Sequence, residues 1–272
     1  MLSALRTLRG LTVGAISFVH MIFVLNPIQC LSILVMPFSP KLCRRINRWA
    51  ARSIWGLWVI LTERINGIDV RFTGDHLPRG ENAVIICNHQ SMSDVMALIC
   101  LAWRCGRISD LKWFAKDILK FVPGIGWGMW FLDCVFVKRD WMRDKPSIER
   151  TFSKYVDHNI PLFLITFLEG TRKTGAKHQA SQAFARERGL YVPQHTMVPR
   201  TKGFAATIQG LRPHLDAVYD ITIGYPGTHP PGLFACFAAR TDRVELHLSR
   251  YAIADVPKDA QALNEWVHAR FY

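Results

Sequence analysis

A histidine and an aspartate, His89 and Asp94, stand five residues apart, directly after the apolar run Ala83–Cys87. Side chains three or four residues apart meet on one helix, but side chains five apart do not. The pair can therefore meet only if His89 precedes the start of a helix. The pattern predicts a strand over Ala83–Cys87, a short loop, and a helix over Met92–Trp103. His89 would then lie at the carboxyl end of a strand, where open α/β sheets bind ligands.

Proton transfer is the chemistry that this pair supports. A neutral imidazole accepts a proton near pH 7. An aspartate on the other ring nitrogen fixes the tautomer and stabilises the imidazolium that forms. A hydroxyl carried by the substrate could be activated in this way, so the protein would need no nucleophilic Ser or Cys of its own.

Asp94 also has a structural interpretation. Ser91-Met92-Ser93-Asp94 matches the capping-box pattern, in which the acidic side chain accepts a hydrogen bond from the Ser91 backbone N–H. The seven residues of this segment alone favour capping, so both roles stay open at this point.

A second loop carries groups suited to a phosphate. The apolar run Pro161–Phe167 is followed by Leu168 and then by Glu169, Gly170, Thr171 and Arg172. Glycine lets the backbone approach a ligand, and Thr171, Arg172 and the backbone amides are donors to phosphate oxygens. Taken alone, such a loop is more often an ordinary glycine turn with solvated charges.

A third apolar run, Val135–Val137, is followed directly by the basic residues Lys138 and Arg139. Arg139 is therefore a second candidate for phosphate binding. The structural alternative is an ordinary strand end, at which the charged side chains of Lys138 and Arg139 are simply solvated.

Charge and hydropathy indicate an anionic membrane partner. The chain has 34 Lys and Arg against 21 Asp and Glu, a formal net charge of +13, and such a balance favours nucleic acid, anionic lipid or a phosphorylated substrate. Leu11 to Met36 contains no charged residue. As a helix this run would reach roughly 39 Å, more than the ~30 Å hydrocarbon core of a bilayer. The membrane therefore outranks nucleic acid.

The flanks of this run predict its orientation. Five basic residues follow it before the first acid, Glu63, which places the rest of the chain on the cytoplasmic side. Asn26-Pro27 interrupts the run near its middle, and the later apolar segment Trp49–Leu61 is too short to span and carries Arg52. A tilted single span and a re-entrant helical hairpin both fit.

The cysteines and histidines give no sign of a metal or a disulfide framework. The seven cysteines form no C-x-x-C pair, and the ten histidines show no ligand spacing. We expect reduced, mostly buried thiols and no metal.

Short apolar runs alternate with helical patterns, which predicts an α/β fold with a mixed sheet flanked by helices. The expected strands are Asp69–Phe72, Ala83–Cys87, Leu111–Phe114, Cys134–Val137, Leu162–Phe167, Thr196–Val198, Val218–Ile223 and Val244–Leu248. The expected helices are Met92–Trp103, Asp144–Asp157, His178–Arg188, Gly203–Leu211 and Ala260–Phe271.

Four motifs in order resemble those of the glycerolipid acyltransferase family, which includes the 1-acylglycerol-3-phosphate acyltransferases. They are Asn88-His89-x-x-x-x-Asp94, Phe136-Val137-Lys138-Arg139, Phe167-Leu168-Glu169-Gly170-Thr171-Arg172 and Val198-Pro199-Arg200. The resemblance runs from about Trp49 to Leu211 and is nearest to the branch that contains lysocardiolipin acyltransferase. Together with the apolar N-terminal run, it gives the expected organisation: a membrane-anchoring segment over residues 1–62 and an acyltransferase domain over 63–272. The last residues lie within a helical pattern that relatives continue, as in a truncated chain or one with a shortened C-terminus.

The resemblance also implies a reaction and its residues. His89 would act as general base on the acceptor hydroxyl, with Asp94 orienting it. Arg139 and the loop Glu169–Arg172 would bind the phosphate of a lysophospholipid, and Pro199 would shape the acyl-donor region. The expected acceptor is 1-acyl-sn-glycerol-3-phosphate or another lysophospholipid, and the expected donor is acyl-CoA or an acyl-carrier protein. No cofactor is expected, since acyl-CoA is a co-substrate.

Two other functions remain open. Water in place of the acceptor would make the protein a thioester or lipid hydrolase. A non-catalytic, membrane-anchored protein could bind anionic head groups through its arginines, although such a protein would have no use for His89 before a helix start. Nucleic-acid binding is not expected, because no recognition-motif spacing is present.

Overall fold

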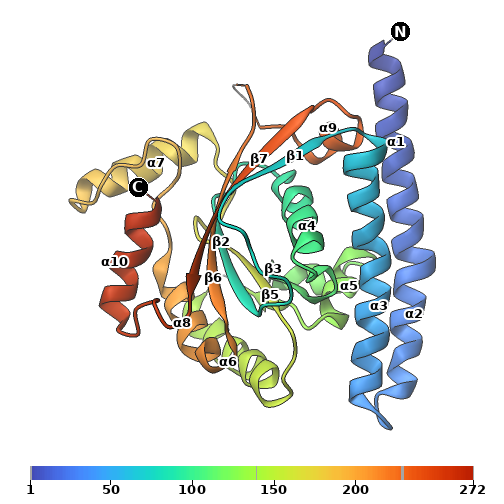
Figure 1. Ribbon diagram of the computed structural model, residues 1–272, viewed down its shortest axis with the longest axis horizontal. Coiled ribbons are helices and arrows are strands. Elements are labelled where there is room, and N and C mark those ends of the chain that lie inside the picture. Colours follow the sequence, from blue (N-terminus) through green and yellow to red (C-terminus); the bar gives the residue numbers. More distant parts are fainter. Residues whose placement is uncertain (1, 139, 228–229, 272) are drawn as a thin grey trace.

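A seven-stranded mixed sheet forms the centre of the computed structural model, which describes residues 2–138, 140–227 and 230–271 (Figure 1). The strands are β1 Asp69–Gly74, β2 Ala83–Cys87, β3 Leu111–Lys116, β4 Val135–Val137, β5 Phe163–Phe167, β6 Ala217–Gly224 and β7 Arg243–Ala252. They are ordered β1-β7-β6-β2-β5-β3-β4. The strands from β6 to β4 are parallel, whereas β7 is antiparallel to β6, and β1 is parallel to β7. The predicted α/β fold with a mixed sheet is confirmed.

Helices cover both faces of this sheet. They are α3 Pro40–Val59, α4 Asp94–Arg104, α5 Ile125–Phe131, α6 Trp141–Asp157, α7 Gly175–Glu187, α8 Thr201–Leu211, α9 Leu233–Phe237 and α10 Ala260–Phe271. Ala83, Ile85 and Cys87 of β2 belong to the core cluster shared with α3 and α4. Val84 and Ile86 belong to the opposite cluster, with α6, α8 and α10. Since β2 is buried on both faces, its sequence is continuously apolar rather than alternating.

One predicted strand, Thr196–Val198, is wrong. The backbone there pairs with side chains instead of with a neighbouring strand: the Met197 N–H donates to Glu169 and the Val198 N–H to the Ser181 hydroxyl, each over 2.9 Å. The other predicted strands and all five predicted helices are present. Ala83–Cys87 and Ala260–Phe271 have the predicted ends, and the ends of the others are shifted. α6 begins three residues earlier than predicted, because the Asp140 side chain accepts from the Met142 and Arg143 N–H groups and caps the helix. The short helices α5 and α9 were not predicted.

The N-terminal segment is a helical hairpin. α1 (Leu2–His20), a π-helical turn (Met21–Leu25) and α2 (Asn26–Ser32) form one helix, along which α3 packs in the opposite direction (Figure 1). Ser3–Val35 is long and apolar enough to cross a membrane, with a mean hydropathy of 1.9. The expectation that Pro27 interrupts this segment is wrong. Its missing N–H falls where the hydrogen bonding changes from the π turn to α2, so the helix continues.

Buried polar side chains fasten this hairpin to the rest of the chain. Asn26 accepts a hydrogen bond from the Gly124 N–H over 2.6 Å and donates one to the Gly124 carbonyl over 3.1 Å. Nearby, the Ser32 hydroxyl and the Asn47 side chain are hydrogen-bonded between the two arms of the hairpin. The hairpin also shares one continuous apolar core with the sheet, through residues such as Leu25 and Ile54. It is therefore packed on the sheet domain rather than attached by a linker.

Replacing Asn26 with Ala should lower the free energy of unfolding by ~1–3 kcal/mol, because the buried N–H of Gly124 loses its hydrogen-bond partner, whereas the Gly124 carbonyl keeps the Gly128 N–H. Denaturant unfolding of the detergent-solubilised protein measures this. The matched control is Asn264→Ala on α10, where the side chain is partly exposed. Equal stabilities of the two variants would contradict a structural role for Asn26.

Candidate active site

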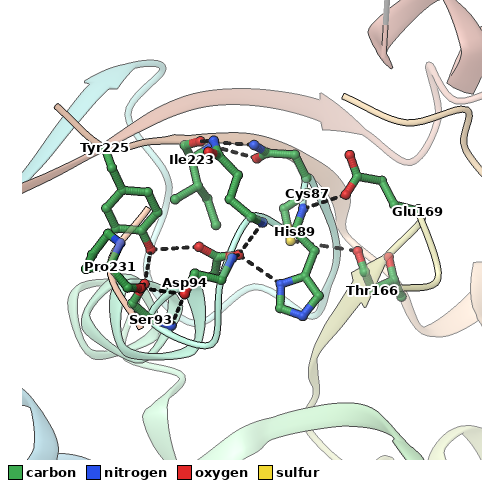
Figure 2. Close-up of polar contacts among 12 residues, drawn as sticks. Cys87, His89, Ser93, Asp94, Thr166, Glu169, Ile223, Tyr225 and Pro231 are labelled. Carbon is green, nitrogen blue, oxygen red and sulfur yellow. Dashed lines mark hydrogen bonds and ion pairs between the residues drawn. The ribbon is translucent and has the colours of Figure 1, made fainter. Parts of the chain in front are cut away.

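The segment from β2 to α4 has the predicted strand, loop and helix. His89 lies in the loop and α4 begins at Asp94, so the histidine precedes the helix (Figure 2). The His89 Nδ1 atom lies 2.8 Å from the Asp94 Oδ2 atom. An ionised carboxylate only accepts hydrogen bonds, so Nδ1 carries the proton. In the neutral ring, Nε2 is then the free base.

Asp94 performs both roles that its sequence position suggested. Its Oδ2 atom accepts the His89 ring N–H and also the backbone N–H groups of Gln90, at 2.7 Å, and Ser91, at 2.9 Å. The bond from Ser91 is the one that a capping box requires. The residue is fully buried. The same carboxylate oxygen thus folds the loop and orients the imidazole.

The loop is also held against the end of β6. Asn88 accepts from the Ile223 N–H over 2.8 Å and donates to the Ile223 carbonyl over 3.0 Å. The Gln90 side-chain amide donates to the same carbonyl over 2.6 Å. These bonds join the carboxyl ends of two neighbouring parallel strands, which fixes the position of His89 relative to the sheet.

An aromatic ring determines the plane of the histidine. His89 stacks on Phe167, the last residue of β5, with ring centroids 3.8 Å apart and an interplanar angle of 19°. The imidazole is 11% exposed. Within the described residues, Nε2 has no protein hydrogen-bond partner, so the edge of the ring opposite Asp94 is available to a substrate.

Glu169 lies behind the histidine backbone. One oxygen accepts the His89 N–H and the other the Met197 N–H, each at 2.9 Å. The residue is only 3% exposed. Burial raises the pKa of Glu169 to about 7, although the two N–H donors and Lys173 act in the opposite direction. This carboxylate therefore positions two loops and does not face solvent.

The rest of the predicted phosphate loop lies close by. The Lys173 N–H donates to the His89 carbonyl over 2.8 Å, which draws the loop onto the histidine. Gly170 has a φ of +70°, and a Cβ there would lie 2.9 Å from the Arg200 side chain. Both facts require glycine. Arg172 is exposed, and in the described part of the chain its side chain has no ion-pair or hydrogen-bond partner.

The structure brings most of the predicted site residues together. His89, Asp94 and the loop Glu169–Arg172 are adjacent. Pro199 is buried next to Arg200, whose N–H donates to the Leu168 carbonyl over 2.7 Å. Arg139 lies outside the described residues.

The predictions from sequence omitted two residues of this site. Arg200 lies across Gly170, and its place in the fourth motif was the available signal. Tyr225 donates to the second oxygen of Asp94 over 2.6 Å. Since it lies 131 residues from Asp94 in the chain, no local pattern identifies it.

The chain is similar to known acyltransferases. The Acyltransferase family model matches residues 69–225. The 1-acyl-sn-glycerol-3-phosphate acyltransferase 2 of Arabidopsis thaliana is 31% identical over 88% of this chain and 63% of its own length. The probable 1-acyl-sn-glycerol-3-phosphate acyltransferase 5 of the same plant is 34% identical over 99% of this chain and 72% of its own. The human 1-acyl-sn-glycerol-3-phosphate acyltransferase delta is 32% identical over 90% and 66%.

The fold has a counterpart among solved structures. The 1-acyl-sn-glycerophosphate acyltransferase of Thermotoga maritima superposes with a TM-score of 0.60 over 100% of this chain and 95% of its own, at 16% identity. The chain spans 63–65% of the length of the plant enzymes that it matches first. The family model covers more than half of the chain, from β1 to Tyr225, and includes both His89 and the loop Glu169–Arg172. The protein is therefore a member of the acyltransferase family.

Proposed function

We propose that the protein transfers a fatty acyl group from acyl-CoA to the free hydroxyl of 1-acyl-sn-glycerol-3-phosphate, with His89 as the general base. The observation that carries this proposal is the His89–Asp94 pair, in which Asp94 binds one ring nitrogen and the other has no partner among the described residues. The printed names of the relatives support the choice of acceptor, and the exposed arginine of the phosphate loop agrees with an anionic lipid.

The reaction needs no covalent acyl-enzyme. His89 Nε2 removes the proton of the acceptor hydroxyl as its oxygen attacks the thioester carbonyl, and an ester C–O bond forms. The C–S bond then breaks, and the imidazolium returns the proton to the leaving thiolate. Asp94 stabilises the imidazolium while it exists. Thioester cleavage supplies the driving force, so the protein's task is proton transfer and alignment of two substrates.

The acceptor phosphate has a suitable site beside His89. Arg172 is exposed and unpaired in the described chain, and Arg200 lies across Gly170 in the same loop region. Arg172 lies two residues after Gly170 and both arginines are exposed, and guanidinium groups bind phosphate oxygens in a bidentate manner. We also propose that Arg139 binds the acceptor phosphate and that Pro199 shapes the acyl-donor region, as the family resemblance implies.

The N-terminal hairpin is proposed to hold this site at the cytoplasmic face of a membrane. The first arm, Ser3–Val35, exposes large apolar side chains, among them Phe23 in the π-helical turn at 70% and Leu34 after α2 at 69%. The adjacent α3 exposes Arg45 and Arg52, which suit anionic head groups rather than hydrocarbon. A helix pair with one apolar and one basic arm fits a surface-seated hairpin better than two full spans.

Replacing His89 with Ala should lower turnover by ~10²–10⁴, the usual contribution of a general base, while the protein stays folded. The assay measures thiol release from acyl-CoA in the presence of lysophosphatidate, and mass spectrometry identifies the lipid product. His158→Ala, at an exposed position, is the matched control. Turnover retained by folded His89→Ala would refute the mechanism, and release of free fatty acid in place of phosphatidate would indicate a hydrolase.

Replacing Arg172 with Ala should weaken acceptor affinity by roughly one to two orders of magnitude, because a charge-assisted hydrogen bond contributes ~1.5–3 kcal/mol. Lysine should restore only part of the loss, since it lacks the bidentate fork. Saturation curves for acceptor and donor measure both effects. Arg186→Ala on α7 controls for the change in net charge. A loss confined to the donor curve would move the loop Glu169–Arg172 out of the acceptor site.

The full-length protein should stay with membranes in high salt, because apolar insertion is insensitive to charge screening. Changing the exposed residues Phe23, Leu31 and Leu34 to Ser should convert it to a salt-releasable form without disturbing the buried face of the hairpin. Sedimentation after salt washing measures retention, with Phe184→Ser on α7 as control. If salt alone released the unmodified chain, the hairpin would not be a membrane element.

A further inference from the structure

The second oxygen of Asp94 is occupied by a tyrosine. Tyr225 directly follows β6, and its hydroxyl lies 2.6 Å from Asp94 Oδ1, while Oδ2 serves His89 (Figure 2). A carboxylate provides no proton for a hydrogen bond, so the tyrosine is the donor. The phenol, the carboxylate and the imidazole thus form one continuous chain that ends at Nε2, the proposed base.

The hydroxyl of Tyr225 is itself held in place. Ser93 Oγ lies 2.9 Å from the tyrosine oxygen and 2.7 Å from the Pro231 carbonyl, and Ser93 is only 2% exposed. The Ser91 hydroxyl donates to the same carbonyl. The stretch that follows β6 is therefore fastened to the His89 loop at Tyr225 and again at Pro231. A tyrosine that only packed in the core would not need these hydrogen bonds, so the position of the Tyr225 hydroxyl is specifically fixed.

We propose that Tyr225 is a positioning residue that acts on His89 through Asp94. Its hydrogen bond fixes the rotation of the carboxylate, so that Oδ2 stays aligned with Nδ1. It also draws negative charge away from the carboxylate, which weakens the pull of Asp94 on an imidazolium. His89 is then deprotonated, and ready as a base, at a lower pH than it would be without the tyrosine. The catalytic consequence rests on the proposed function.

Other titratable groups near His89 and Asp94 could also contribute to the pH dependence of activity. They are Cys87, Glu169, Lys173, Tyr225 and Cys236. Burial raises the pKa of Cys87, of Cys236 and of Tyr225, so these three groups are neutral at pH 7. Glu169, with a pKa of about 7, titrates in the same range as a histidine. Its hydrogen-bond partners are the His89 and Met197 N–H groups, so Tyr225→Phe leaves these bonds in place, and a titration that follows the His89 ring itself separates the two groups.

The test is Tyr225→Phe, which removes one oxygen atom. Activity requires neutral His89 and is lost as pH falls through the pKa of the histidine. Without the hydrogen bond, Asp94 holds the imidazolium more strongly, this pKa rises, and the acid limb of the kcat/KM profile should move upward by roughly 0.5–1 pH unit. At pH 7, kcat/KM should fall about tenfold or more, from the shift together with lost alignment.

Tyr219→Phe is the matched control. Tyr219 lies on β6, the strand that Tyr225 follows, and its hydroxyl donates to the carboxylate of Glu81. Both variants should lose similar stability, but only Tyr225→Phe should shift the pH profile. Incorporating 3-fluorotyrosine at position 225 gives a second measurement, since a more acidic phenol is a stronger donor and should move the acid limb downward.

NMR titration of the His89 ring, assigned by its loss in His89→Ala, follows the same pKa without any turnover. If the wild-type protein does not acylate lysophosphatidate while the His89 pKa still rises in Tyr225→Phe, the proposed function fails and the link between Tyr225 and His89 stands. A His89 pKa and pH profile that are identical in wild type and Tyr225→Phe, with losses equal to those of Tyr219→Phe, would overturn the proposal.

Discussion

A buried negative charge on Asp94 is the constraint on which the arrangement of the site depends. A carboxylate removed from water is costly unless its oxygens are hydrogen-bonded. Asp94 is fully buried and accepts bonds from the His89 ring, two backbone N–H groups and the Tyr225 hydroxyl. It also begins α4, where the helix dipole favours an anion. The sheet must therefore bring the end of β2, the start of α4 and the end of β6 to one point.

Glu169 performs a similar task on the other side of His89. It binds the histidine N–H and the Met197 N–H, so one side chain joins the loops after β2 and β5 to the segment before α8. Two carboxylates in one buried region repel each other, and Asp94 contributes to the raised pKa of Glu169. Under the proposed function, Asp94 would stabilise a transient positive charge on the imidazole that it binds. The environment thus suits a group that alternates between neutral and protonated forms.

Local patterns were sufficient to predict the parts of the site that local hydrogen bonds create. The spacing of His89 and Asp94 predicted a histidine before a helix, and the loop after β5 was placed correctly. The failures have long-range causes. The segment Thr196–Val198 has residues typical of a strand. Its N–H groups, however, donate to the side chains of Glu169 and Ser181 and not to a neighbouring strand. Tyr225 reaches Asp94 only because β6 lies beside β2, a pairing that single-sequence patterns do not encode.

The N-terminal hairpin shows how polar residues can determine the geometry of an apolar segment. Apolar packing alone would let the two helices slide or rotate on the sheet domain, because lipid and core are equally apolar environments. Two polar contacts prevent this movement: Asn26 is hydrogen-bonded to Gly124, and Arg48 forms an ion pair with Asp110 at 2.6 Å. They allow only one register of the hairpin on the sheet domain. Both contacts lead to segments that flank β3, and β3 neighbours β5, the strand that carries Phe167 and precedes the loop Glu169–Arg172. Under the proposed function, this fixed register sets the height and tilt of His89 above the membrane. A lipid acceptor that stays in its bilayer then meets the base in one orientation, which a flexible tether of the same length would not provide.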